Sequence, residues 1–226
     1  MTKITRNLLY IAGLVLMLAM FGCGNSGTST TKPSKANIAI KAATEDGDAV
    51  VLEEVNLQVV AGFEAYVLHD MQLSAIKLDS SEPTIIDSLS DNEFFLFRAL
   101  GIDTEGNRYA GQTLAKITGE NTPVAVTCIP YTDFSGFEGN YSNESGNITV
   151  QADSNGIGDF GGHLGSLEGY YEGVIYFAPT TTSGKMGVVG LLWNSSSHNV
   201  VTATGSAEGD TIKLNAGSAG TLTFTK

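Results

Sequence analysis

The sequence predicts an all-β protein, a β-sandwich followed by a small antiparallel β-meander or barrel. Residues 36–130 contain short runs rich in β-branched and aromatic side chains, separated by turn residues, as in sandwiches. Residues 131–226 hold 17 of the chain's 27 glycines, and their strand-like runs alternate regularly with turns. Neither region shows a convincing helical period, which favours the all-β class.

Strand-like runs follow one another closely in the first region. ANIAIKA, at residues 36–42, alternates between apolar and polar positions, so Ile38 and Ile40 share one face. EFFLFRALGI, at residues 93–102, is the most apolar run and predicts a central strand. Residues 80–92 read as a polar connection around a short apolar piece, and they allow a helical turn. The other predicted strands lie within residues 47–60, 63–68, 71–78, 108–117 and 123–129.

The second region reads as a series of antiparallel hairpins. Turn sequences such as DSNG, PTTTSG and AEGD separate the runs. Glycines within the runs permit bends and close backbone approach, which suits a small curled sheet or barrel. This pattern of glycines, short strands and turns is similar to that of glycine-rich β-meander domains at the carboxy ends of exported bacterial proteins. The predicted strands span residues 146–153, 156–165, 168–178, 184–194, 198–207, 210–215 and 220–226.

The first 22 residues have the features of an export signal. Lys3 and Arg6 precede an uncharged apolar run at residues 8–21, which is too short to span a bilayer comfortably. The run ends in Gly22 and Cys23, an ending that resembles the lipobox of bacterial lipoproteins. The resemblance implies that the leader is cut before Cys23 and that this cysteine carries a diacylglycerol and an acylated amino terminus. The alternative is an ordinary secretory signal with an incidental cysteine.

The same resemblance implies a location. In enterobacterial lipoproteins, a residue other than Asp after the cysteine favours the outer membrane, and Gly24 fills that position here. The polar residues that follow are rich in Ser and Thr and are expected to form a flexible tether. The expected parts of the chain are a signal peptide at 1–22, the lipidated cysteine and tether at 23–35, the sandwich at 36–130 and the meander or barrel at 131–226.

A second resemblance lies in FLFRALGIDTEGNRYAGQTL, at residues 95–114. This stretch is similar to the last hairpin of bacterial immunoglobulin-like and fibronectin type III-like domains, in which a strand meets a D-x-x-G-N turn and pairs back. Ala99, Asp103, Gly106 and Asn107 fill the matching positions. The resemblance implies an immunoglobulin-like sandwich and carries no activity.

Net charge and cysteine content exclude some kinds of binding partner and of covalent cross-link. Without the leader, ten basic residues face 24 acidic ones, which gives a formal net charge of −14. Such a surface repels nucleic acid, so we expect no nucleic-acid partner. With Cys23 lipidated, Cys128 has no cysteine with which to pair, and we interpret it as a buried small hydrophobe in the run VAVTCI.

The sequence gives little support for a catalytic or metal-binding site. Metal, haem-attachment, nucleophile-elbow and phosphate-loop motifs do not occur in the sequence. Asp153, Asn155 and Asp159 alternate somewhat as in a calcium loop, but the twelfth position lacks its glutamate, and a hairpin turn is the simpler interpretation. His163 is interpreted as structural. We therefore expect no catalytic residues, no cofactor beyond the lipid, and metal binding at most through these three weak candidates.

An aromatic group in the second region is the other candidate site. On a strand, Tyr171 and Phe177 share one face and Tyr170 and Tyr176 share the other. An exposed face could bind sugar or a protein partner, whereas coverage of both faces in a small barrel is the simpler interpretation. The candidate surface consists of Tyr170, Tyr171, Tyr176, Phe177 and Trp193.

Together these observations predict a membrane-anchored, non-enzymatic binding or scaffold component of a cell-envelope or surface assembly, with the membrane and envelope proteins as partners. The alternative is a small-ligand or glycan binder, which predicts a barrel cavity lined by Tyr171, Phe177 and Trp193. An enzyme is a third hypothesis, which would need His163 and an acidic partner to converge in a cleft.

Overall fold

A computed structural model describes residues 33–61, 70–72, 83–131, 135–152, 160–167, 171–194, 200–217 and 220–226, all within the compact unit Lys32–Lys226. Only the backbone is described for residues 61, 70–72, 135, 152, 160–167, 171–172, 193–194 and 200. The described chain forms strands, turns and a short 3-10 helix, η1 (Ser135–Phe137), which confirms the all-β prediction. No helix in these ranges is long and apolar enough to cross a membrane.

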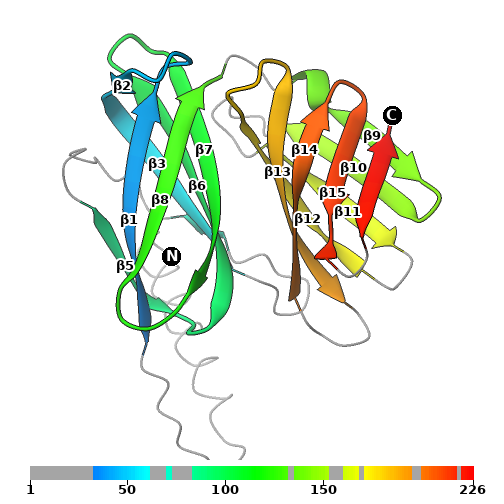
Figure 1. Ribbon diagram of the computed structural model, residues 1–226, viewed down its shortest axis with the longest axis horizontal. Coiled ribbons are helices and arrows are strands. Elements are labelled where there is room, and N and C mark those ends of the chain that lie inside the picture. The colour runs from blue at the N-terminus through cyan, green and yellow to red at the C-terminus, as the bar shows by residue number, and fades with distance from the viewer. Residues whose placement is uncertain are drawn as a thin grey trace, which may run out of the picture. The chain divides into compact units, whose positions relative to one another are not determined.

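The first sheet contains eight strands in the order β2-β1-β8-β7-β6-β3-β4, with β5 paired to β1 (Figure 1). β1 runs parallel to β8, and the other pairs in this sheet are antiparallel. The strands are β1 (Ser34–Ala43), β2 (Ala49–Val50), β3 (Leu52–Ala61), β4 (Asp70–Gln72), β5 (Thr84–Leu89), β6 (Glu93–Asp103), β7 (Arg108–Ile117) and β8 (Thr122–Pro130).

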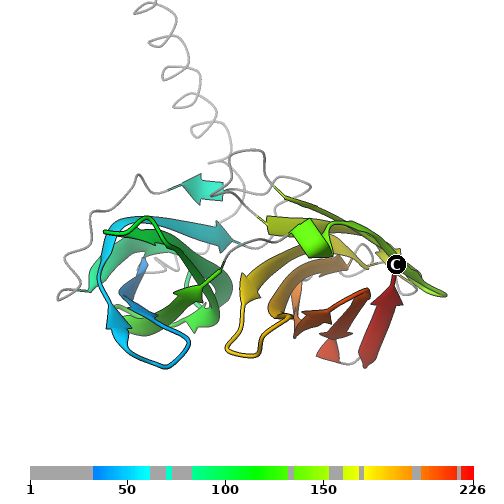
Figure 2. The ribbon, with the colours of Figure 1, turned by 90° about the horizontal axis from the view of Figure 1, so that it is seen from above.

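The first sheet curls on itself, as the view from above shows (Figure 2), and its strands share one buried apolar core. β6 lies inside the sheet between β3 and β7, as its apolar run predicted. Alternate residues of the strands point into the core, and β8 contributes Val124, Val126 and Cys128. Cys128 is fully buried, as expected for a small hydrophobe, and burial raises the pKa of its thiol to about 12.

One expectation is wrong, because the stretch Thr84–Leu89 is a strand and not part of a polar connection with a helical turn. Ile86 and Leu89 are buried three positions apart, a spacing that is typical of a helix. In the structure this spacing comes from a β-bulge, since two residues of β5 lie opposite one residue of β1 between these two apolar positions. Ser88 accommodates the bulge with a φ of 66°.

The predicted hairpin at the D-x-x-G-N turn is present and joins β6 to β7. Asp103 organises the turn, because its Oδ1 accepts hydrogen bonds from the backbone N–H groups of Glu105 and Asn107, both at 2.9 Å. Its Oδ2 accepts from Asn107 Nδ2 at 2.9 Å and from the Tyr109 hydroxyl at 3.3 Å. The hairpin is not the last in its sheet, in contrast to the resemblance, because β8 follows and pairs with both β7 and β1.

The second sheet closes into a barrel in which each strand pairs antiparallel with the next strand along the chain. This arrangement confirms the predicted meander or barrel. Its strands are β9 (Gly139–Asn143), β10 (Gly146–Ala152), β11 (Phe160–Leu167), β12 (Tyr171–Pro179), β13 (Lys185–Asn194), β14 (Val200–Glu208), β15 (Thr211–Asn215) and β16 (Thr221–Thr225).

The barrel closes where β16 meets β9, a strand that the sequence did not predict. β9 reads GNYSN, a polar run in which only Tyr141 is buried, so neither alternation nor β-propensity marks it. The two strands pair through Thr225 and Ser142. Lys226 supports this closure, since its ammonium donates to the Gly136 carbonyl at 2.8 Å and lies 5.3 Å from the Tyr141 ring.

Apolar side chains fill the described part of the barrel interior, as is usual for eight strands. The described buried cluster includes Tyr141, Ile175, Phe177 and Phe224. Glycine allows the strands to approach closely, because a Cβ at Gly205 would overlap the carbonyl oxygen of Lys213 on the neighbouring strand. This is the role expected of glycines inside the barrel strands.

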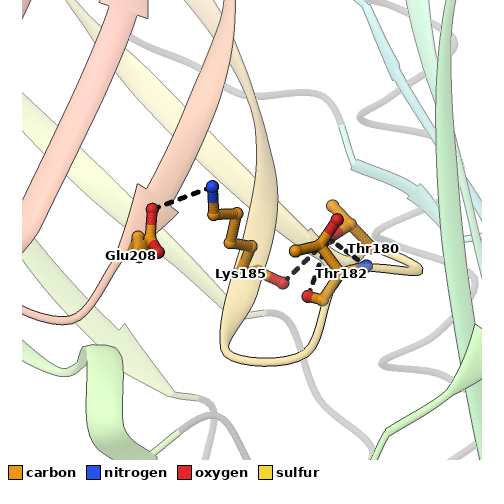
Figure 3. Close-up of polar contacts among 4 residues, drawn as sticks. All are labelled: Thr180, Thr182, Lys185 and Glu208. Atoms are coloured by element: carbon orange, nitrogen blue, oxygen red, sulfur yellow. Dashed lines mark hydrogen bonds and ion pairs between the residues drawn. The ribbon is translucent and has the colours of Figure 1, made fainter.

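In the hairpin between β12 and β13, polar groups of the turn form hydrogen bonds with one another (Figure 3). The Thr180 hydroxyl donates to the carbonyls of Thr182 and Lys185, each at 3.2 Å, and accepts from the Thr182 backbone N–H at 3.3 Å. Lys185 then reaches across to Glu208 on β14 at 3.0 Å. This ion pair is exposed at the surface, so it contributes little to stability.

The Asp103 turn generates a prediction about pH. The hydrogen bonds to its carboxylate, that from the Asn107 side chain above all, hold its pKa below the usual range. The stabilisation is therefore complete above the unfolded-state pKa of about 3.9 and is lost as the pH falls through the lower folded-state value. We expect Asp103→Asn to lower the free energy of unfolding at pH 7, and the difference from the wild type to shrink in acid.

Urea unfolding at neutral pH and at acidic pH measures this difference. Asp103→Ala is the matched variant, since it removes both acceptor oxygens and should destabilise the hairpin at either pH. An Asp103→Asn deficit that is the same in acid as at neutral pH would contradict the assigned role of the carboxylate.

Candidate functional site

Strand β6 is buried on both of its faces. Phe95 and Phe97 point into the core of the first sheet. The alternate residues Leu96 and Arg98 point to the opposite side of the strand and are also buried. Arg98 is only 2% exposed. A strand of a two-layer protein normally leaves its outer face in water, so something must cover this face of β6.

The second sheet supplies the cover. Its strands β12 and β13 contribute apolar side chains to a buried cluster that also contains residues of β3 and β6. We call this cluster, with its neighbouring polar residues, the intersheet seam. Its apolar members are Val60, Leu96, Tyr176, Val189 and Leu191, with Leu114 and Val174 packed against them. Full burial of such a side chain contributes about 1.5–3 kcal/mol, so the seam is a substantial part of the fold.

Arg98 is the charged centre of the seam and binds groups from both sheets. Its Nη1 donates to Gln58 Oε1 at 2.8 Å, within the first sheet. Its Nη2 donates to the carbonyl of Phe177 at 3.4 Å, and its guanidinium carbon lies 4.6 Å from the centre of the Tyr176 ring. Burying a charge is costly unless neighbouring groups compensate, and a desolvated cation–π contact contributes about 2 kcal/mol.

Gln112 forms a second polar link across the seam. Its side-chain Nε2 donates to the carbonyl of Tyr176 at 3.0 Å and to the carbonyl of Gly187 at 3.3 Å. These acceptors belong to adjacent strands of the second sheet, whereas Gln112 lies on β7 of the first. Because hydrogen bonds are directional, the arrangement fixes the position of β7 relative to β12 and β13.

The chemistry of the seam is structural. It combines an arginine, two glutamines, a tyrosine ring and aliphatic side chains, which together hold two sheets in one orientation and exclude water. In the described part of the chain, no group of three or more His, Cys, Asp or Glu residues could hold a metal ion. The Asp103 carboxylate, the best organised among the described acidic turns, already accepts four hydrogen bonds.

The structure describes only some of the residues singled out in the sequence. Tyr176 and Phe177 lie on opposite faces of β12, as alternation predicted, and they are 5% and 1% exposed. Tyr176 packs in the intersheet seam, and Phe177 packs in the barrel core. Neither side chain forms an open surface. The rest lie outside the described residues or side chains, and these are Cys23, Asp153, Asn155, Asp159, His163, Tyr170, Tyr171 and Trp193.

The sequence patterns did not predict the polar residues of the seam. A signal for Arg98 was present, because it is the single charge inside the apolar run FFLFRALGI. A charge at that position has to find polar partners if the strand is buried. Gln58 and Gln112 carry no comparable signal, since each follows the ordinary pattern of a strand with one polar face.

Comparisons with known proteins do not add a function. The sequence matches no model of a known protein family, and no curated protein is significantly similar to it. The class defined by the structure is thus an all-β protein in which a curled mixed sheet and a closed antiparallel barrel share a buried interface.

The seam predicts a measurable coupling between Arg98 and Tyr176. In a double-mutant cycle with Arg98→Met and Tyr176→Leu, we expect a coupling free energy of about 2 kcal/mol, because this cation–π contact is desolvated. Chemical unfolding of the four proteins gives the value.

The chain offers a matched control for this cycle. Lys116 lies over the Phe94 ring at 5.8 Å on the surface of the first sheet, and Phe94 is 41% exposed. The cycle with Lys116→Met and Phe94→Leu should give only about 0.5–1 kcal/mol. If the buried pair coupled no more strongly than this exposed pair, Arg98 would not join the sheets as described.

Proposed function

We propose that this protein is a lipid-anchored, non-enzymatic scaffold or binding component of a bacterial cell-envelope assembly. The structural observation that carries the proposal is the intersheet seam, because it makes two sheets into one body that can present a fixed surface to a partner. The anchor is inferred from the sequence, where the apolar leader ends in Gly22 and Cys23.

The physical properties of the chain suit this role. Two or three acyl chains on Cys23 would hold the protein at a membrane almost permanently, since each buried CH₂ contributes roughly 0.8 kcal/mol. The polar residues 24–33, which precede β1, would let the body stand away from the lipid surface. The acidic body favours envelope partners with cationic surfaces and disfavours nucleic acid. Gly24 favours the outer membrane by its resemblance to enterobacterial lipoproteins.

Lipidation is the first part of the proposal to test. In cells fed a fatty-acid analogue that can be tagged, we expect the wild-type protein to carry the label and to fractionate with membranes, and Cys23→Ser to lose both properties. Cys128→Ala is the matched control, because this buried thiol should not be acylated and its loss should leave the label unchanged. A Cys23→Ser protein that stayed labelled would exclude this anchor.

Capture of a binding partner tests the scaffold role. Capture of the tagged wild-type protein from its own membranes in mild detergent should bring down a stoichiometric envelope protein, and Cys23→Ala should lose or weaken that complex. A protein that comes down alone would argue against the scaffold role. The Gly24–Lys226 body would then be screened against glycans and small ligands.

A further inference from the structure

The strands β1 and β8 connect the first sheet to what precedes and follows it. β1 begins at Ser34, within the last two residues of the stretch expected to form the tether, and β8 ends at Pro130, just before the segment that leads to the barrel. These two strands form a parallel ladder of seven residue pairs, from Ala36 with Thr122 to Ala42 with Cys128. The tether therefore enters at one end of the ladder, and the connection to the barrel leaves at the other end.

This geometry determines how the ladder responds to tension. A load between the tether and the barrel pulls β1 and β8 in opposite directions along their length, so all pairs of the ladder bear it together. A load applied to both strands at the same end would instead open the pairs one after another. Forced unfolding depends on the rate at which the loaded structure breaks, so a ladder that must break as a whole withstands more force.

The tether end of the ladder is held to two neighbouring turns. The buried Ser34 hydroxyl donates to Asp91 Oδ1 at 2.8 Å, and the backbone N–H of Gly119 donates to the same oxygen at 2.8 Å. The Lys35 N–H donates to the Gly119 carbonyl at 3.1 Å. These bonds tie the first residues of β1 to the turns before β6 and before β8, so a load on the tether reaches the ladder without first peeling the strand.

Packing reinforces the ladder on a second side. Ile38 of β1 and Val124 and Val126 of β8 are buried in the core of the first sheet. The first half of β1 also pairs with β5, from Ser34 to Ile38. Sliding β1 along β8 would therefore disrupt apolar contacts and a second set of strand pairs in addition to the ladder itself.

We propose that the ladder of residues 36–42 and 122–128 is the load-bearing junction of the protein, which carries tension between the membrane anchor and a partner bound to the body beyond β8. The source of the load rests on the proposed anchor at Cys23. The resistance of the ladder follows from strand direction alone, so the two can be tested separately.

Single-molecule pulling on the unlipidated chain from Cys23 to Lys226 tests the junction. One handle is attached at Cys23, the residue that would carry the lipid, and the other at Gly136→Cys, beyond the far end of the ladder. A Cβ at Gly136 meets no atom within 4 Å. The matched protein carries its second handle at the exposed Asn121→Cys, at the same end of the ladder as the tether. Cys128 does not compete for the handles, because it is buried.

The rupture force for β1 should be several-fold higher with the Gly136→Cys handle than with the Asn121→Cys handle. Circular dichroism spectra that match the wild type establish that both proteins are folded. Equal rupture forces in the two directions would overturn the load-bearing role, whether or not Cys23 is lipidated in cells. A large difference together with an unlipidated Cys23 would uphold the resistance of the ladder and remove the membrane as the source of load.

Discussion

Arg98 brings a permanent positive charge between two β-sheets, and groups from both sheets hold it there. Gln58 belongs to the first sheet, whereas the Tyr176 ring and the Phe177 carbonyl belong to the second. Arg98 can stay buried only while the second sheet supplies these contacts, because a buried charge without partners is costly. The mutual position of the sheets is therefore tied to the burial of this one residue.

The remaining architecture follows from burial on two faces. β6 gives alternate side chains to the core of its own sheet and to the intersheet seam, and β12 does the same with Phe177 and Tyr176. Each sheet thus has its own core but also shares a third cluster with its neighbour. β1 and β8 run parallel, so the sequence before β1 and the chain after β8 leave from opposite ends of one ladder. Such a body suits a scaffold that holds a partner at a distance from a membrane.

Local pattern predicted most of the strands, and it failed where pairing depends on distant segments. The alternation and the D-x-x-G-N turn were sufficient for β6 and β7, and glycine-punctuated runs were sufficient for most of the barrel. β5 was misread because a bulge gave Ile86 and Leu89 the spacing of a helix, and β9 was missed because its only buried side chain is Tyr141. The closure of the barrel at Thr225 and Ser142 joins segments far apart in the sequence.

The candidate site was harder to predict than the fold. The sequence placed Tyr176 on the opposite strand face from Phe177, but it could not show that the first sheet covers this face. The partners of Arg98 and Gln112 are mostly backbone carbonyls of the other sheet, and a carbonyl leaves no signature in side-chain pattern. Recognition of such a seam requires the tertiary arrangement, because only that arrangement brings the two sheets together.

Native-state hydrogen exchange of the full body tests most directly whether the two sheets are one cooperative unit. We expect amides of β6 in the first sheet and of β12 in the second to exchange through openings of the same free energy, and this free energy to equal that of global unfolding. If β12 opened at a distinctly lower free energy while β6 remained protected, the sheets would be independent, and the central role given to Arg98 would be wrong.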